Sequence, residues 1–342
     1  MKKLNYLISA AAMAVALVMV SCSGKDDPVV PEKPKITNGM ELSEALQYCD
    51  VQNGVPTLNL PAGVSLVCTT EMELVTPLAI VGDASSPATI KVSGEGKFIG
   101  GVRIENAVID ASELAAPLVT IAKEDAAEWE FSSASFINVT MTGLKQALVY
   151  SGGKNYNVSL VVENSRIQVA ADVTVFDFTK GSFPILFEIK NSTFWAPEAT
   201  GKAFFSSQSG QKANEMEGGT ETFDFENSTF YNLTKSKNFF THRQANQTWL
   251  AYIVKDCIFV NCGKSGQAIK GMNGGQSGKN PTWDISGNVF NFEDADTSEA
   301  ESTGDDDEPI KDSKAVVVKF ADAANGDFTQ ADAKAGDPIW IK

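Results

Sequence analysis

The 342-residue sequence contains one histidine, no CxxC pair, and fewer basic than acidic residues, with 28 Lys and Arg against 43 Asp and Glu. A catalytic metal site built from several histidines is therefore excluded. The formal net charge of −15 would repel phosphate backbones, so we expect no binding to nucleic acid. The N-terminal apolar run at 4–20 is shorter than the roughly 20 residues that a membrane-spanning helix needs. An apolar content of 43% excludes a wholly disordered chain.

The first 22 residues have the pattern of an export signal. Lys2 and Lys3 precede an apolar run that ends at Ser21 and Cys22, as in a bacterial signal peptide. The segment Met19-Val20-Ser21-Cys22 resembles a lipobox, in which the cysteine is acylated and becomes the new N-terminus. We therefore expect residues 1–21 to be a lipoprotein signal peptide and Cys22 to carry a lipid anchor that does not cross the membrane.

Residues 22–36 follow as a tether that contains Pro28, Pro31 and Pro34, a composition typical of an extended linker. The acidic pair at 26–27 resembles the signal that sends lipoproteins of Bacteroidetes to the outer face of the outer membrane. A solvated linker is the alternative reading of these acids. We expect a lipid-anchored protein of the outer membrane, exposed at the cell surface, with a periplasm-facing lipoprotein as the alternative.

An apolar pattern then repeats seven times along the chain. Apolar residues stand at each anchor position and again five and seven positions before it, with mostly polar residues between them. Alternation with a period of two is typical of a strand with one buried face. The anchors are Ile109, Phe136, Ile167, Phe194, Phe230, Phe259 and Phe290.

Each repeat also carries a bend signal three positions before its anchor. Asn, Asp and Gly tolerate the left-handed backbone that a sharp bend requires, and stacked Asn side chains could hydrogen-bond along the column. A third short apolar piece, such as Val175-Phe176, follows about ten residues after most anchors. The pattern predicts an all-β, right-handed parallel β-helix with three strands per coil. A β-sandwich, the alternative, gives no reason for a bend at one offset. The bend column reads Asn106, Ser133, Asn164, Asn191, Asn227, Asp256 and Gly287.

The chain from 37 to 342 resembles the pectate-lyase-like β-helix proteins, and among them surface lipoproteins of Bacteroidetes. Glu41–Cys49 has helical periodicity and could cap the open end of the solenoid. The first coils and the closing segment are also similar to those of that family. The residues that carry this resemblance are 41–49, 58–63, 78–82, 326–328 and 334–340.

Two other features leave alternatives open. Cys49, Cys68, Cys257 and Cys262 could form disulfides in an exported chain or serve as small buried side chains. The segment 293–312, inserted in the last coil, is strongly acidic and could capture Ca²⁺. Its acids do not fit an EF-hand loop, because Glu299 stands where glycine is required. We expect a solvated acidic loop and no cofactor, with Ca²⁺ as the alternative.

The catalytic candidates lie at the ends of the predicted third strands. The resemblance implies that lyases of this fold need a base near a carboxylate cluster, and hydrolases need paired acids. His242 and Arg243 follow one third strand and Lys270 the next, so the three could be neighbours. No acidic pair occupies the matching positions, and a solvated strand end is the alternative for these candidates. We expect a binding protein rather than an enzyme.

Two aromatic residues are candidates for binding sugar. Trp195 and Tyr231 each stand one position after an anchor, so their rings should point outward from consecutive coils and could stack on sugar rings. A loop that covers this strand is the alternative. The resemblance and these aromatics together predict a polysaccharide-binding or accessory protein of glycan acquisition. A polysaccharide lyase or glycoside hydrolase, and a structural or adhesive surface protein, are the alternatives.

Overall fold

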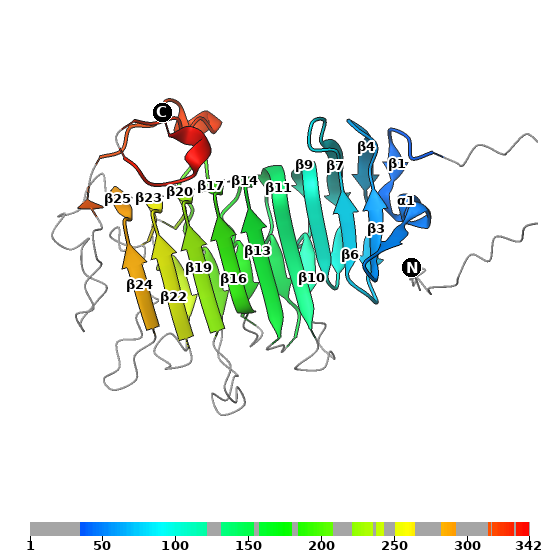
Figure 1. The fold of residues 1–342 in the computed structure, drawn as a ribbon, viewed down its shortest axis with the longest axis horizontal. Coiled ribbons are helices and arrows are strands. Elements are labelled where there is room, and N and C mark those ends of the chain that lie inside the picture. The colour runs from blue at the N-terminus through cyan, green and yellow to red at the C-terminus, as the bar shows by residue number, and fades with distance from the viewer. Residues whose placement is uncertain are drawn as a thin grey trace, which may run out of the picture.

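A computed structural model describes residues 35–121, 131–153, 157–179, 184–207, 221–234, 237–242, 250–263, 282–291, 314–315, 317–331 and 333–341. These residues form a parallel β-helix of stacked coils (Figure 1). One 19-stranded sheet supplies two faces of the solenoid and a seven-stranded sheet supplies the third. The predicted fold class, an all-β parallel β-helix, is confirmed.

The first face consists of the strands that precede the bend. Here β9 and β11 are long enough to continue through the bend into the second face. The strands of this face are β3 (Val55–Asn59), β6 (Leu78–Val81), the first part of β9 (Val102–Leu114), the first part of β11 (Ser132–Leu144), β13 (Val158–Glu163), β16 (Pro184–Lys190), β19 (Glu221–Glu226), β22 (Leu250–Lys255) and β24 (Thr282–Ser286).

The second face follows the bend and the third face closes the coil. The second face includes the last parts of β9 and β11. Beside the first face, β2 (Asp50–Gln52) pairs antiparallel with β3. The other strands of the second face are β1 (Met40–Glu41), β4 (Ser65–Cys68), β7 (Ala88–Gly94), β14 (Arg166–Val169), β17 (Thr193–Trp195), β20 (Thr229–Tyr231), β23 (Ile258–Val260), β25 (Val289–Asn291) and β26 (Lys314–Ala315). The third face contains β5 (Glu71–Glu73), β8 (Lys97–Ile99), β10 (Val119–Ile121), β12 (Val149–Ser151), β15 (Phe176–Phe178), β18 (Phe205–Ser207) and β21 (Phe240–His242).

In the seven coils from β9 to β25, one left-handed residue makes the bend between the first and second faces. The predicted register of the coil that contains β11 is wrong. Its bend residue is Asn138 and not Ser133, and Met141, not Phe136, aligns with Ile109. Apolar residues stand at the required offsets in both registers, so hydrophobicity alone does not choose between them, and the residue able to adopt a positive φ decides. The bend residues are Asn106, Asn138, Asn164, Asn191, Asn227, Asp256 and Gly287, with φ between 48° and 68°.

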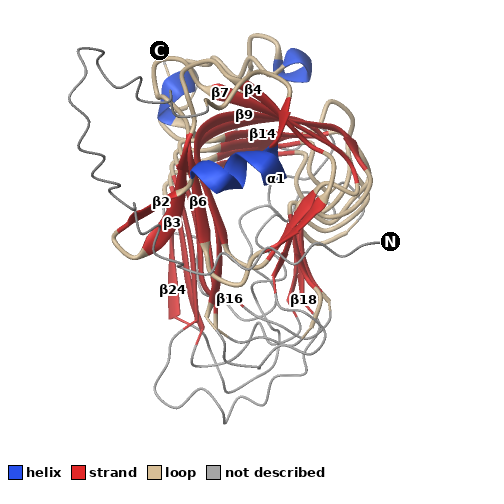
Figure 2. Cartoon of the chain, turned by 90° about the vertical axis from the view of Figure 1, so that its right-hand side faces the viewer, coloured by secondary structure: helices blue, strands red, loops and turns tan. Residues whose placement is uncertain are grey.

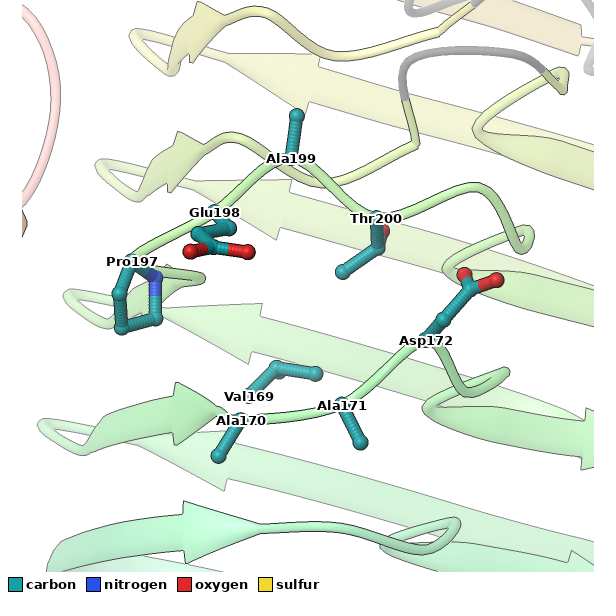
Figure 3. Close-up of a pocket in the computed structure, with 8 residues that line it drawn as sticks. All are labelled: Val169, Ala170, Ala171, Asp172, Pro197, Glu198, Ala199 and Thr200. Atoms are coloured by element: carbon teal, nitrogen blue, oxygen red, sulfur yellow. The ribbon is translucent and has the colours of Figure 1, made fainter.

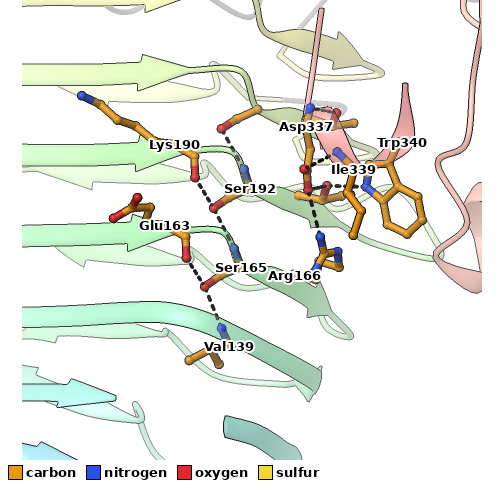
Figure 4. Close-up of polar contacts among 12 residues, drawn as sticks. Val139, Glu163, Ser165, Arg166, Lys190, Ser192, Asp337, Ile339 and Trp340 are labelled. Carbon is orange, nitrogen blue, oxygen red and sulfur yellow. Dashed lines mark hydrogen bonds and ion pairs between the residues drawn. The ribbon is translucent and has the colours of Figure 1, made fainter. Parts of the chain in front are cut away.

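Hydrogen bonds along the bend column come from two kinds of side chain. Asn138 Nδ2 donates to Asn106 Oδ1 at 2.7 Å, as the predicted Asn ladder requires. In later coils the buried residue after the bend takes this role (Figure 4). Ser192 Oγ donates to the carbonyl of Lys190 at 2.7 Å and accepts from Ser165 N at 3.1 Å. These hydroxyls satisfy backbone groups that cannot reach water.

Replacing Ser192 by alanine is expected to lower the free energy of unfolding by about 1–3 kcal/mol, because the buried Ser165 N–H would lose its acceptor. Urea denaturation followed by circular dichroism measures the change. Ser159→Ala is the matched control, since this side chain points outward from β13. Equal effects of the two substitutions would show that the buried hydroxyl contributes nothing.

A short helical segment closes the N-terminal end, as predicted. The helix α1 (Leu42–Ala45) and the 3₁₀ turn η1 (Leu46–Tyr48) lie across the opening between the faces (Figure 2). Leu42, Ala45 and Leu46 are buried there against the first coils. Among the described residues, no helix has the length and apolar character needed to span a membrane.

The C-terminal strap, residues 317–331 and 333–341, folds back against the second face (Figure 1). It contains the 3₁₀ turns η4 (Ala323–Asn325) and η5 (Pro338–Trp340). Phe328 of the strap is fully buried, and a small apolar cluster joins other strap residues to β23 and β25. This cluster is separate from the main core inside the coils.

Candidate binding site

The structure covers the aromatic pair that the sequence singles out. The covering segment that the sequence offered as the alternative to exposed rings is present, and Trp195 is only 7% exposed. Phe328 of the strap packs against Trp195 with ring centroids 5.8 Å apart and against the half-buried Tyr231 at 5.5 Å. Phe328 follows Trp195 by 133 residues in the chain, and the segment that carries it shields the apolar surface of the second face from water.

The catalytic candidates fall mostly outside the described residues. His242 ends β21 and aligns with Ser207 of β18 on the third face. Arg243 and Lys270 lie outside the described residues, so the structure does not bring the three together or separate them. Cys22, the tether up to residue 34 and the acidic segment 293–312 lie outside them as well.

The four described cysteines are free thiols: Cys49, Cys68, Cys257 and Cys262. Burial, followed by the nearby Asp50 charge, raises the pKa of Cys49 to about 11. Burial likewise raises the pKa of Cys262 to about 12. Thiols with such pKa values are protonated near neutral pH and are poor nucleophiles and metal ligands. No three His, Cys, Asp or Glu side chains in the described part of the chain are placed to hold a metal ion.

A charged cluster on the first face links two coils. Lys190 Nζ lies 2.8 Å from Asp224 Oδ2 and 2.9 Å from Glu188 Oε1. Desolvation opposes the charged form of Lys190, but hydrogen bonds to these two carboxylates raise its pKa above the ordinary value. A lysine held in its protonated form cannot act as a base. The cluster therefore joins β16 to β19 and is not a candidate for lyase chemistry.

A surface cavity of about 430 Å³ opens where the second face turns into the third. This volume is within the range of small-ligand sites. Two loops line it, one after β14 and one after β17, and Figure 3 shows Glu198 and Thr200 extending from one loop toward the other. Short side chains keep the space open. The lining residues are Val169, Ala170, Ala171, Asp172, Pro197, Glu198, Ala199 and Thr200.

Hydrogen bonds hold the cavity loops in place. Asp172 Oδ1 accepts from Gly201 N at 2.6 Å and so ties the two loops together. Thr200 Oγ1 accepts from Thr234 N of the next coil at 2.8 Å. Glu198 is exposed at the rim. Ionised carboxylates only accept hydrogen bonds, so the site suits a ligand that carries several donors.

The third face presents a row of outward side chains beside this cavity. The first four members each lie between two buried residues of their strand, the fifth is exposed, and neighbours in the row are aligned by the strand register. Successive members are about 4.8 Å apart, the spacing of neighbouring strands. The cavity loops continue directly into β15 and β18, which carry two members of the row. The row is Thr120, Tyr150, Asp177, Ser206 and Thr241.

Sequence reasoning missed both parts of this site. The row could have been predicted from the sequence, because Tyr150 and Ser206 follow apolar residues of the predicted third strands. The cavity residues Asp172 and Glu198 gave no signal, since they lie in loops of different sequence that share no repeating column. No family model matches this chain, and no curated protein sequence is similar to it.

Proposed function

We propose that this protein is a lipid-anchored protein of the outer membrane surface that binds polysaccharide as part of glycan acquisition. The lipobox at Cys22, the acidic tether and the resemblance to surface lipoproteins support the location. The observation that carries the binding function is the cavity beside the row of outward hydroxyl, carboxyl and phenol groups on the third face.

The chemistry of a polysaccharide matches this arrangement. Sugar hydroxyls can donate hydrogen bonds to carboxylates such as Glu198. They can both donate to and accept from the hydroxyls of Ser206 and Thr241. The ring of Tyr150 offers an apolar face together with a polar tip. Because every strand of the face is hydrogen-bonded to its neighbours, binding would cost little conformational entropy.

Affinity electrophoresis through gels that contain plant and host glycans tests this function. We expect the native protein to be retarded by at least one glycan, and the double variant Tyr150→Ala/Glu198→Ala to bind that glycan at least about tenfold more weakly. Each of these side chains is outward or exposed, so thermal unfolding should be unchanged.

Glu163→Ala is the matched control, because it removes an outward carboxylate from the first face. Equal loss of retardation in the control would contradict a site on the third face. Release of unsaturated or reducing ends from any glycan of the same panel would replace the binding function with catalysis, and loss of that activity in Arg243→Ala would identify its base.

A further inference from the structure

The strap covers its face with polar contacts that are only partly satisfied. Trp195 Nε1 is buried beneath it without a hydrogen-bond partner among the described residues. The Asp337 carboxyl, which is 2% exposed, is by contrast satisfied: it accepts from Thr193 Oγ1 at 2.8 Å and from Ile339 N at 3.2 Å, so the bond to Thr193 must break when the strap leaves. Buried polar atoms of a native structure normally have partners. The unpartnered indole N–H is therefore a donor that a ligand could use once the strap has moved.

The coils beneath the strap are complete without it. The anchors Phe194, Phe230 and Phe259 point inward and belong to the main core, which is separate from the apolar cluster under the strap. The strands β17, β20 and β23 are paired with one another in register. Departure of the strap would thus leave the coil interior closed.

Movement of the strap would uncover two rings in a fixed arrangement. Trp195 and Tyr231 are register partners on consecutive coils, so their rings follow the solenoid axis one coil apart. An indole and a phenol in this arrangement offer two flat apolar faces and two polar tips. Such a pair fits neighbouring sugar residues of one chain, with Trp195 Nε1 as donor to a hydroxyl or ring oxygen.

We propose that the C-terminal strap is a detachable cover over a second glycan-binding strip formed by Trp195 and Tyr231. The ligand class rests on the proposed function, whereas the strip is separate from the cavity on the third face. In the covered state Phe328 occupies the position that a sugar ring takes in the open state. Polysaccharide and strap therefore compete for the same two rings.

Two glycines of the strap provide a way to open it without altering the coils. Gly326 has a φ of +86°, and a Cβ atom there would lie 3.0 Å from Trp195 Cζ2. Gly336 has a φ of +88°, and a Cβ atom there would lie 2.6 Å from Thr229 Oγ1. Alanine at either position is strained and pushes the strap away. Gly54→Ala is the matched control, since Gly54 also has a positive φ but meets no atom within 4 Å.

Limited proteolysis of the full chain and glycan affinity electrophoresis together test the cover. We expect Gly326→Ala and Gly336→Ala to make the strap sensitive to protease and to strengthen glycan binding by about tenfold. Trp195→Ala added to either variant should remove this gain. The control Gly54→Ala should match the native protein in both measurements.

Three results would overturn the cover. The strap could stay protease-resistant in Gly326→Ala, Gly336→Ala and Asp337→Asn, which would make it a fixed part of the fold. It could detach without any gain in glycan binding. The gain could also survive Trp195→Ala. The variant Tyr150→Ala/Glu198→Ala separates this proposal from the site on the third face: a gain that persists in that background supports the strip even if the third face binds nothing.

Discussion

Phe204→Ala is expected to lower the free energy of unfolding by about 3–5 kcal/mol, the usual cost of removing a buried phenylalanine from a packed core. Phe204 is 1% exposed. Its ring centroid lies 4.6 Å from that of Phe239 and 5.1 Å from that of Phe194. Because Phe204 and Phe239 come from consecutive coils, the cavity left by alanine would interrupt the stacking of the solenoid.

Chemical denaturation followed by far-ultraviolet circular dichroism measures this effect. Phe131→Ala is the control, because Phe131 is 56% exposed and its removal should change the free energy of unfolding by less than about 0.5 kcal/mol. The sequence pattern predicts that Phe131, five positions before the anchor Phe136, points inward. The pair of variants therefore also tests the corrected register of β11. Comparable losses in the two variants would contradict that register.

Glu221→Leu is expected to stabilise the protein at neutral and alkaline pH. Glu221 is fully buried at the start of β19, and neither carboxyl oxygen has a partner among the described residues. Its register partner in the next coil is the buried Leu250, so leucine suits the same column. Removal of an unpartnered buried polar group is expected to raise the free energy of unfolding by about 1–3 kcal/mol.

The pH dependence of that gain follows from the direction of the pKa shift. Burial raises the pKa of Glu221 well above its ordinary value of 4.5. The folded state therefore binds the Glu221 proton more tightly than the unfolded chain does. The stability that comes from this tighter proton binding is fully present below pH 4.5. The contribution is lost as the pH rises through the raised pKa of the folded state. The gain from Glu221→Leu should accordingly grow with pH.

Urea midpoints of the native protein and Glu221→Leu at pH 5 and pH 8 measure this difference. Glu221→Gln keeps the shape but cannot ionise, so it should also flatten the pH dependence. Glu163→Gln, an outward carboxyl on the first face, is the control and should follow the native curve. A native curve that is parallel to that of Glu221→Leu would show that Glu221 does not titrate between these pH values.

Most of the coil architecture was predictable because it depends on neighbouring residues. Alternation of apolar and polar side chains places Val158, Leu160 and Val162 on one side of β13, and this follows from strand geometry alone. A left-handed bend at Asn164 or Asn191 follows from the backbone freedom of asparagine. The misaligned coil shows the limit of this reasoning, because apolar residues stand at the required offsets in two registers of that coil.

The binding site and the covered face depend on contacts between distant residues. The sequence alone determined that strands and bends recur along this chain behind an N-terminal capping helix, since each reflects local periodicity and backbone preference. The tertiary structure decided that Phe328 shields Trp195, that Asp172 meets the loop of Glu198 at a cavity, and that Glu221 lies where water cannot reach it. Such features arise from which segments pack together, and segments far apart in the chain carry no shared pattern that records their contact.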